Sequence, residues 1–319
     1  MSRCILPFVS GVVRWGPDYT RPFGERRAAL QVPARFDYEV ATSVEEAISL
    51  LERHGPEARL LAGGHSLIPM MKLRLAFPET LIDIHELDGD LRYIREVNGA
   101  LEIGALARHQ DLLDSEVIGE RYPILRDAET MIADPLVRNM GTVGGSLAHG
   151  DPAEDLPAAF MALGCEVVVR GPDGERSIPI DGLQTGPFET VLDPAEIIVG
   201  ARVLRAPMGS AYTKVKRRTG DYASAAIGVA LDMGDGEIRD AGIGMCAVDG
   251  QTLRASGAEE ILEGQRPDAE LYRRAGERAA EESNPPEDAR GPVEYKRDLV
   301  KVLVARALEQ AVERAGGGA

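Results

Sequence analysis

The chain is poor in cysteine: its 319 residues include three, Cys4, Cys165 and Cys246, and no two of them lie close together. Zinc and iron–sulfur centres are usually built from closely spaced cysteine pairs such as C-x-x-C, which this sequence lacks. We therefore do not expect a metal site built by this chain alone. The scattered pattern is typical of a reducing compartment, and the apolar runs around Cys165 and Cys246 predict that both are core residues.

Positive charge is also scarce. Asp and Glu total 52 and Lys and Arg total 36, so the formal net charge is -16. This balance argues against nucleic acid as a partner, because phosphate backbones are bound by basic surfaces. No apolar run reaches the roughly 20 residues that a membrane-spanning helix needs. The composition, 44% hydrophobic and 28% charged, is that of a globular protein, and the length suffices for two domains or lobes.

Near the start of the chain, residues 16–27 have no periodic pattern. A short apolar run from Cys4 to Val13 loosely resembles a signal peptide, but it has no convincing cleavage site and ends abruptly at Arg14. We interpret residues 1–31 as a disordered tail or as the product of a start codon assigned too early. The fold is expected to begin at Val32.

Glycine, by contrast, is plentiful, and two segments contain it in pairs. Residues 62–72 read AGGHSLIPMMK, and residues 141–152 read GTVGGSLAHGDP. Paired glycines let a backbone approach a ligand closely and turn its N–H groups toward an anion. We predict that the two segments converge on one diphosphate, which indicates a dinucleotide cofactor. The absence of G-x-G-x-x-G argues against a Rossmann site.

Local signals predict the elements around these segments. Thr42 or Ser43, followed by acidic residues, is an N-cap for a helix that ends near Arg53. A strand at 58–62 leads into the first glycine segment, and Asp151-Pro152 predicts the N-cap and first residue of a helix after the second. Further strands are expected at 81–84, 93–97, 101–103, 165–170 and 177–180, and further helices at 108–113 and 123–133.

This mixture of helices and repeated hairpins predicts an α+β fold rather than a doubly wound parallel sheet. A boundary is expected at about 206–210. Beyond it, three strands at 211–216, 225–233 and 237–248 predict a sheet. Charged, alanine-rich helices follow, and the last is expected at 293–315.

Polar residues within the glycine segments are the first site candidates. Ser66, Thr142 and Ser146 could donate hydroxyl hydrogen bonds to phosphate oxygens. His65 and His149 have no carboxylate–histidine spacing nearby, so we expect them to shape or line a cofactor cleft rather than to bind metal.

Two other regions have both a plain and a functional interpretation. Asp155, in the first turn of a predicted helix, is either a favourable N-terminal acid or an acceptor for a ribose hydroxyl. The basic stretch from Lys214 to Tyr222 is a solvated strand end, a source of charge near an anionic cofactor, or a docking surface; Tyr222 could present its ring to a flat heterocycle. No nucleophile or general base stands out, so we expect the cofactor to supply the chemistry.

Residues 62–75, 132–157 and 214–226 together resemble the FAD-binding medium subunit of the molybdenum hydroxylases, the family of xanthine dehydrogenase and aerobic carbon monoxide dehydrogenase. The likeness is greatest to the carbon monoxide dehydrogenase branch and covers nearly all of residues 32–315. It implies a two-lobed FAD-binding domain like that of vanillyl-alcohol oxidase at 32–208. A C-terminal domain of a three-stranded sheet with helices would occupy 209–319.

The resemblance also implies cofactor-binding roles. Ile132 would lie by the adenine end, Asp155 would contact the ADP part, Tyr222 would flank the isoalloxazine ring, and Lys214 would be a basic residue near the flavin. Ser146 stands where an asparagine-like residue is usual. The two pyrophosphate-binding stretches would be Ala62, Gly63, Gly64, His65, Ser66 and Leu67, and Thr142, Val143, Gly144, Gly145 and Ser146.

The family likeness further implies non-covalent FAD and no metal ligand or catalytic side chain on this chain. Its partners would be a large molybdopterin subunit and a small subunit with [2Fe–2S] clusters, in a dimer of heterotrimers. Electrons would pass to a quinone or to NAD, in the cytoplasm or peripherally at the inner face of the membrane. The alternatives are a stand-alone flavin oxidase or reductase and a non-catalytic scaffold. The substrate stays open among carbon monoxide, purines, N-heterocycles and aldehydes.

Overall fold

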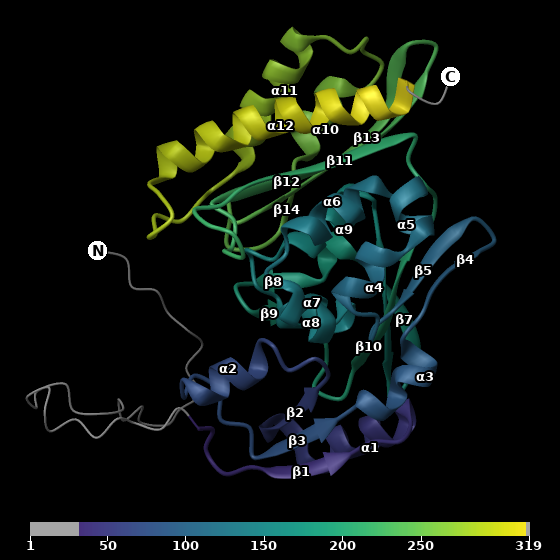
Figure 1. Cartoon of the computed structure of the whole chain (residues 1–319), viewed down its shortest axis with the longest axis vertical. Helices are drawn as coiled ribbons and strands as arrows, with labels where there is room; N and C mark the ends of the chain where they lie inside the picture. Colours follow the sequence, from purple (N-terminus) through teal and green to yellow (C-terminus); the bar gives the residue numbers. More distant parts are fainter. Residues whose placement is uncertain (1–31, 317–319) are drawn as a thin grey trace, which may run out of the picture.

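A computed structural model describes residues 32–316, and our interpretation of residues 1–31 as a tail or mis-assigned start lies outside this range. Three parts follow one another along the long axis of the molecule (Figure 1). The first is a small lobe with a parallel sheet of order β1-β3-β2. Its elements are β1 (Asp37–Val40), α1 (Val44–His54), β2 (Ala58–Leu61), α2 (Leu67–Lys72), β3 (Thr80–Asp83) and α3 (Asp88–Leu91).

The predicted cap of helix α1 is confirmed. The Ser43 hydroxyl accepts from the Glu46 N–H at 3.0 Å, and Gly55 ends the helix with a φ of 66°. One side of α1, including Ala47, Ile48 and Leu51, packs on the small sheet. The polar cap and the apolar stripe both follow from local sequence, which is why this helix could be located in advance.

The second part is a five-stranded antiparallel sheet of order β4-β5-β10-β6-β7, with six helices. The predicted hairpin at Asn98-Gly99 is confirmed, because both residues take positive φ as a two-residue turn requires. The strands are β4 (Ile94–Val97), β5 (Ala100–Gly104), β6 (Glu166–Gly171), β7 (Gly174–Pro179) and β10 (Ile197–Val203), with a separate hairpin of β8 (Gln184–Gly186) and β9 (Glu189–Thr190). The helices are α4 (His109–Asp114), α5 (Glu116–Arg121), α6 (Pro123–Met131), α7 (Pro135–Met140), α8 (Val143–His149) and α9 (Asp155–Ala162).

The second glycine segment is largely helical, because Thr142 caps helix α8, which contains both Gly144 and Gly145. One prediction about this part was wrong. Asp151 does not begin a helix: its carboxylate accepts from the Ala153 N–H at 2.9 Å, and α9 starts only at Asp155. An Asx turn and an N-cap use the same side-chain acceptor, so local sequence does not separate them.

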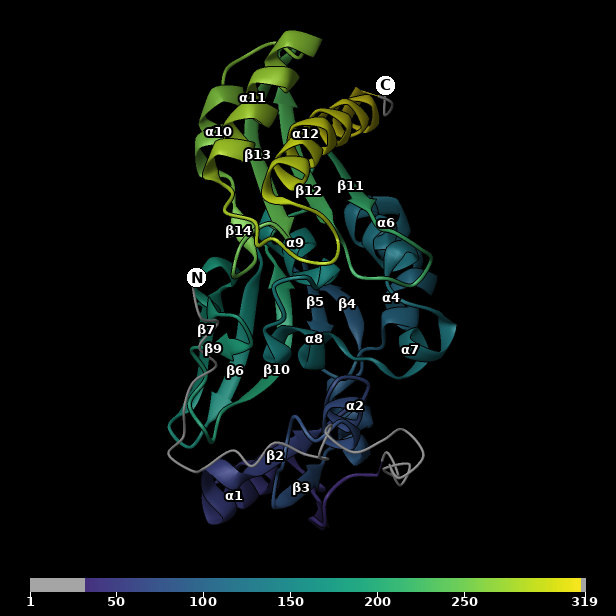
Figure 2. The ribbon, with the colours of Figure 1, turned by 90° about the vertical axis from the view of Figure 1, so that its left-hand side faces the viewer.

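The C-terminal part has β11 (Gly209–Val215), β12 (Ala225–Gly234), β13 (Glu237–Cys246) and the two-residue β14 (Leu253–Arg254) in one antiparallel sheet. The three strands predicted here are confirmed, and β14 adds a fourth. Helices α10 (Ser256–Leu262), α11 (Ala269–Glu282) and α12 (Val293–Gly316) lie over one face of the sheet (Figure 2). Cys165 and Cys246 are buried, as expected. Within residues 32–316, no helix has the length and apolar character needed to cross a membrane.

Helix α9 joins the second and third parts, and all eight of its residues are buried. Glycines in the C-terminal sheet let the helix backbone rest directly on the strands. A Cβ added at Gly244 would lie 2.0 Å from the Ala158 carbonyl oxygen, and one added at Gly242 would lie 2.1 Å from that of Ala162. Any larger side chain at these positions would therefore push helix α9 away from the C-terminal sheet.

We expect Gly244→Ala to lower the free energy of unfolding by about 1–3 kcal/mol, because the added methyl group must displace helix α9 from the sheet. Gly89→Ala is the matched control, since a Cβ there meets no atom within 4 Å. Urea unfolding of both variants measures the difference. Equal stability of the two would contradict the close approach.

Candidate functional site

The first glycine segment connects β2 to α2 and presents unpaired backbone donors. Within residues 32–316, the N–H groups of Gly63, Gly64, His65 and Ser66 donate to no acceptor. Gly64 has a φ of 71°, a left-handed conformation that favours glycine and turns successive amides to one side. Four consecutive free donors are suited to an anion.

The second segment uses its amides differently. The N–H groups of Val143 and Gly144 donate to the carbonyls of Ala107 and Ala105 at 3.0 and 2.8 Å, and that of Gly145 donates to the Thr142 hydroxyl at 3.1 Å. These donors hold helix α8 against the end of β5. The structure thus differs from our expectation that both segments turn free N–H groups toward a ligand. The first segment has free N–H donors, whereas the N–H groups of the second are bonded within the protein and hold helix α8 in place.

The two segments nevertheless meet backbone to backbone. A Cβ added at Gly63 would lie 2.1 Å from the Met140 carbonyl oxygen and 3.0 Å from the Gly141 Cα. Arg108 holds this junction, since its guanidinium donates to the same Met140 oxygen at 2.8 Å, and the His109 N–H donates to the Gly141 carbonyl at 3.2 Å. Sequence reasoning placed Arg108 and His109 at a helix start and missed this contact.

Asp155 and Lys214 form a buried ion pair between two domains. The Lys214 Nζ lies 2.7 Å from Asp155 Oδ2, and the Tyr212 hydroxyl donates to Oδ1 at 2.8 Å. The two charged side chains are 1% and 7% exposed. The solvated strand end considered for Lys214 is therefore wrong. Each carboxylate oxygen keeps a second lone pair, so Asp155 can still accept from a ligand hydroxyl.

Cations also surround the turn that contains Ile132. Lys214 and Lys216 donate to the Met131 carbonyl at 3.4 and 3.2 Å, and Arg138 donates to the Ile132 carbonyl at 2.9 Å. The next residue, Ala133, has a φ of 42°, a conformation that costs energy in a residue with a side chain. The turn is thus held by three cations in an otherwise acidic protein.

Tyr222 lies between β11 and β12 and is 43% exposed. The Arg290 guanidinium sits 5.6 Å from its ring centroid, where it is attracted by the π face. Burial of the hydroxyl, together with Asp151, Glu154 and Asp155, raises the pKa of Tyr222. The phenol therefore stays protonated, and part of the ring is open to contact.

The two histidines of the glycine segments make separate contacts. His65 Nδ1 lies 3.0 Å from the Gly63 carbonyl oxygen, and the His149 ring lies 5.2 Å from that of Phe188, between centroids. Burial lowers the pKa of His149. Among the described residues, no three His, Cys, Asp or Glu side chains gather as metal ligands.

Sequence reasoning missed two acids near the second glycine segment, of which Glu129 is buried and Glu154 is half-buried. Glu129 is fully buried, lies 3.1 Å from His109 Nδ1, and has its pKa raised by burial. Burial opposes protonation of His109, but the Glu129 carboxylate raises its pKa overall. Glu154 accepts from the Ser146 hydroxyl, and burial raises the pKa of Glu154 to about 8. Single acids such as these have no sequence signature.

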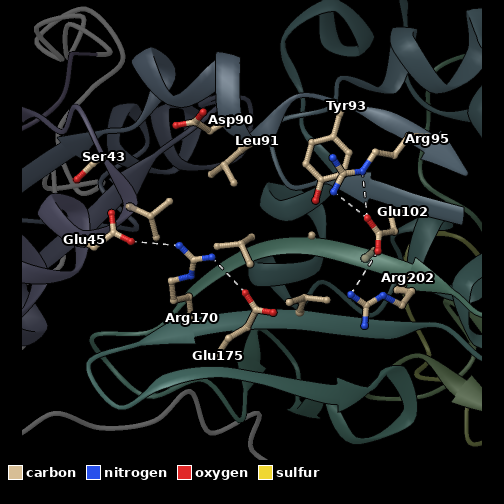
Figure 3. Close-up of a pocket in the computed structure, with 15 residues that line it drawn as sticks. Ser43, Glu45, Asp90, Leu91, Tyr93, Arg95, Glu102, Arg170, Glu175 and Arg202 are labelled. Atoms are coloured by element: carbon tan, nitrogen blue, oxygen red, sulfur yellow. Dashed lines mark hydrogen bonds and ion pairs between the residues drawn. The ribbon is translucent and has the colours of Figure 1, made fainter. Parts of the chain in front are cut away.

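The hollow drawn in Figure 3 is a separate feature, a cavity of about 380 Å³ between α1, α3 and the outer face of the five-stranded sheet. Arg170 joins Glu45 and Glu175 at 3.1 and 3.2 Å, and Glu102 pairs with Arg95 and Arg202. None of the predicted site residues lines it. The cavity is therefore no part of the glycine-segment site, and the arginines that line it already have carboxylate partners.

Two consecutive stretches of this chain match known protein families. Residues 34–203 match the family described as the FAD binding domain in molybdopterin dehydrogenase, and residues 210–311 match the CO dehydrogenase flavoprotein C-terminal domain. The carbon monoxide dehydrogenase medium chain of Hydrogenophaga pseudoflava is 41% identical over 285 residues, 89% of this chain and 99% of that protein. The glyceraldehyde dehydrogenase medium chain of Sulfolobus acidocaldarius is 34% identical over 279 residues, 87% of this chain and 99% of that protein.

A solved structure gives the same result. It is carbon monoxide dehydrogenase from Hydrogenophaga pseudoflava lacking the Mo-pyranopterin moiety of its molybdenum cofactor. The similarity covers 89% of this chain and 99% of the solved chain, with 42% identity and a TM-score of 0.86. The likeness therefore extends over the whole length of the matched chain.

We expect Lys214→Met to lower the free energy of unfolding by about 3–5 kcal/mol, because it leaves the Asp155 carboxylate buried without its cation. Lys301→Met is the matched control: Lys301 pairs with Asp298 at 2.9 Å on the exposed face of α12, where loss of a pair costs about 0–1 kcal/mol. Chemical denaturation measures both. Similar losses in the two variants would show that the Asp155–Lys214 pair is not specially desolvated.

Proposed function

Because this chain belongs to the family of FAD-binding subunits of the molybdopterin dehydrogenases, we propose that it is the FAD-carrying electron-transfer subunit of a molybdenum hydroxylase complex. The observation that carries the proposal is the contact of Gly63 with Met140 and Gly141, which places the four amides that have no acceptor within residues 32–316 at the turn before helix α8. When bound, FAD supplies the conversion between one-electron and two-electron transfer. The chain supplies binding and orientation.

The described residues fit the diphosphate of such a cofactor. Free N–H groups at a positive-φ glycine make an anion-binding concavity, and the Thr142 hydroxyl beside them keeps its own proton for donation. The residues that would hold the diphosphate are Ala62, Gly63, Gly64, His65, Ser66 and Leu67 with Thr142, Val143, Gly144, Gly145 and Ser146. Ile132 would lie by the adenine end, Asp155 by the ADP part, and Lys214 and Tyr222 by the flavin ring.

The fold itself is proposed to be that of the vanillyl-alcohol-oxidase-like flavoproteins, with the FAD-binding domain at 32–208 and the C-terminal domain at 209–319. The three-stranded and the five-stranded sheet, which are separate from each other and both precede β11, support a two-lobed first domain. The short connection between β10, which ends at Val203, and β11, which begins at Gly209, supports the boundary.

Support for partner subunits comes from the relatives, two of which are named as medium chains of dehydrogenases. We propose a large molybdopterin subunit and a small [2Fe–2S] subunit as partners, in a dimer of heterotrimers. Electrons would pass from the small subunit through this chain to a quinone or to NAD, in the cytoplasm or at the inner face of the membrane. Medium chains named for carbon monoxide and for glyceraldehyde are both similar to this chain over almost their full length, so substrate choice is assigned to the large subunit.

Purified chain is expected to carry FAD that acid precipitation releases, and Gly63→Ala is expected to lose it. The added methyl group would push the first segment away from Met140 and disrupt the row of free amides. Flavin absorbance per protein measures retention, and thermal unfolding shows whether the variant is folded. Gly89→Ala is the control. Full flavin occupancy in a folded Gly63→Ala chain would contradict the site, and wild-type chain without flavin affinity would favour a scaffold.

A further inference from the structure

The segment between α11 and α12 packs against the loop that joins β11 to β12. The Arg217 guanidinium donates to the Ala289 carbonyl at 3.0 Å, and the Ser224 hydroxyl donates to the Arg290 carbonyl at 3.3 Å. Arg217 and Ser224 lie on either side of Tyr222 in the chain. The loop is therefore fastened to its neighbour both before and after that residue.

The Arg290 side chain connects the segment to the ring of Tyr222. Its guanidinium carbon lies 5.6 Å from the ring centroid, within the range where a π face attracts a cation. Asp221 Oδ1, on a side chain that is 7% exposed, accepts from Arg290 Nη2 at 3.4 Å and from the Tyr222 N–H at 2.9 Å. The guanidinium is thus tied both to the ring and to the backbone that carries the ring.

A buried lysine anchors the segment that carries Arg290. Lys296, near the start of α12, is 1% exposed, and its Nζ lies 3.0 Å from Asp288 Oδ2 and donates to the Pro286 carbonyl at 2.9 Å. Asp288 Oδ1 in turn accepts from the Arg290 N–H at 2.8 Å. Because a buried charge must keep its partners, Lys296 fixes the backbone from which the Arg290 side chain extends.

One donor of the Arg290 guanidinium is unpaired. Its Nε is buried and has no hydrogen-bond partner within residues 32–316. Buried donors are nearly always paired, so an unpaired one needs an explanation. The contact with the Tyr222 ring gives one, since the guanidinium keeps its place over the ring although one N–H finds no acceptor there.

The Tyr222 ring lies at the edge of the proposed cofactor site and depends on Arg290 for its orientation. A Cβ added at Gly220 would lie 3.4 Å from the Ala133 carbonyl oxygen, so the loop rests against the turn that contains Ile132. In the described part of the chain the Tyr222 hydroxyl forms no hydrogen bond, and the residue is 43% exposed. The cation on its π face is therefore the polar contact that orients the ring.

We propose that Arg290 is a positioning residue that holds the Tyr222 ring in the orientation that a flavin ring requires. The inference rests on the proposed function, in which the open part of the Tyr222 ring contacts the isoalloxazine. A side chain that is ordered before binding does not have to be immobilised by the ligand, so Arg290 strengthens binding without touching the cofactor. The diphosphate is assigned to the glycine segments, so this effect belongs to the flavin end alone.

The test compares FAD with ADP, a probe that has the diphosphate but no flavin ring. The full chain, freed of flavin, is titrated with FAD by fluorescence and with ADP by calorimetry. We expect Arg290→Gln to weaken FAD binding by about two- to fivefold, the loss that corresponds to a partly exposed cation–π contact, and to leave ADP binding unchanged. The residual fluorescence of bound flavin should rise, because a less ordered phenol quenches it less. Arg306→Gln, at an exposed position of α12, is the matched control and should change neither affinity.

Two further variants show whether Arg290 acts through the ring. Tyr222→Leu should itself weaken FAD binding, and in that background Arg290→Gln should cause no further loss, because the two residues act as one unit. Arg290→Lys keeps a positive charge beside Asp221 but not the flat guanidinium, so its FAD affinity should lie between those of wild type and Arg290→Gln. If thermal unfolding shows that Arg290→Gln does not fold, the contrast between FAD and ADP is measured on Arg290→Lys.

Three results would overturn the proposal while leaving FAD binding by the wild-type chain intact. They are unchanged FAD affinity in the Arg290 variants, equal losses of FAD and ADP affinity, and an equal effect of Arg290→Gln with and without Tyr222. Absence of FAD affinity in a wild-type chain that thermal unfolding shows to be folded overturns the assignment of FAD itself and this inference with it.

Discussion

The structure depends on the direct contact of helix α9 with the C-terminal sheet. Side chains usually separate a helix from the sheet it covers, but here Gly242 and Gly244 remove that layer, so the helix backbone touches the strands. Such a direct contact fixes both the distance of the helix from the sheet and its rotation about its own axis, because no flexible side chain lies between them to adjust. Everything attached to α9 is positioned with the same accuracy, including the carboxylate of Asp155 at its first residue.

The Asp155 carboxylate is both packed by helix α9 and paired with charged and polar groups of the C-terminal sheet. Asp155 belongs to helix α9 of the second part of the molecule, whereas Lys214 and Tyr212 belong to the C-terminal sheet. The three side chains meet in a buried site. Burial of two charges is favourable only when both are paired and hydrogen-bonded, so this cluster requires the two domains to dock in one arrangement. The same docking brings Lys216 to the Met131 carbonyl and Tyr222 to its place beside Arg290. The proposed cofactor site is therefore completed only by both domains.

Elements with local signals could be predicted, and elements defined by distant partners could not. Three features depend on only a few adjacent residues, and each was located from sequence: the Ser43 cap, the Asn98-Gly99 turn and the first glycine segment. Strand β10 was missed although the turn signal Asp193-Pro194 precedes its apolar run. The roles of Arg108 and Glu154 were missed because each depends on a contact with a residue that lies elsewhere in the chain. The start of α9 was misplaced because Asp151 can cap either a turn or a helix.

Strand β10 has a consequence for how the protein forms during synthesis. It lies in the middle of its sheet, between β5 and β6, although it follows them in the chain. Its partner β5 ends at Gly104, and the strand itself ends at Val203, so the hairpins made first on the ribosome have no central strand to join them. Pairings between such distant segments are slow because the intervening chain must first be ordered. Until residue 203 emerges, β5 and β6 present unpaired edges, and a nascent chain held at that stage is the form most exposed to aggregation.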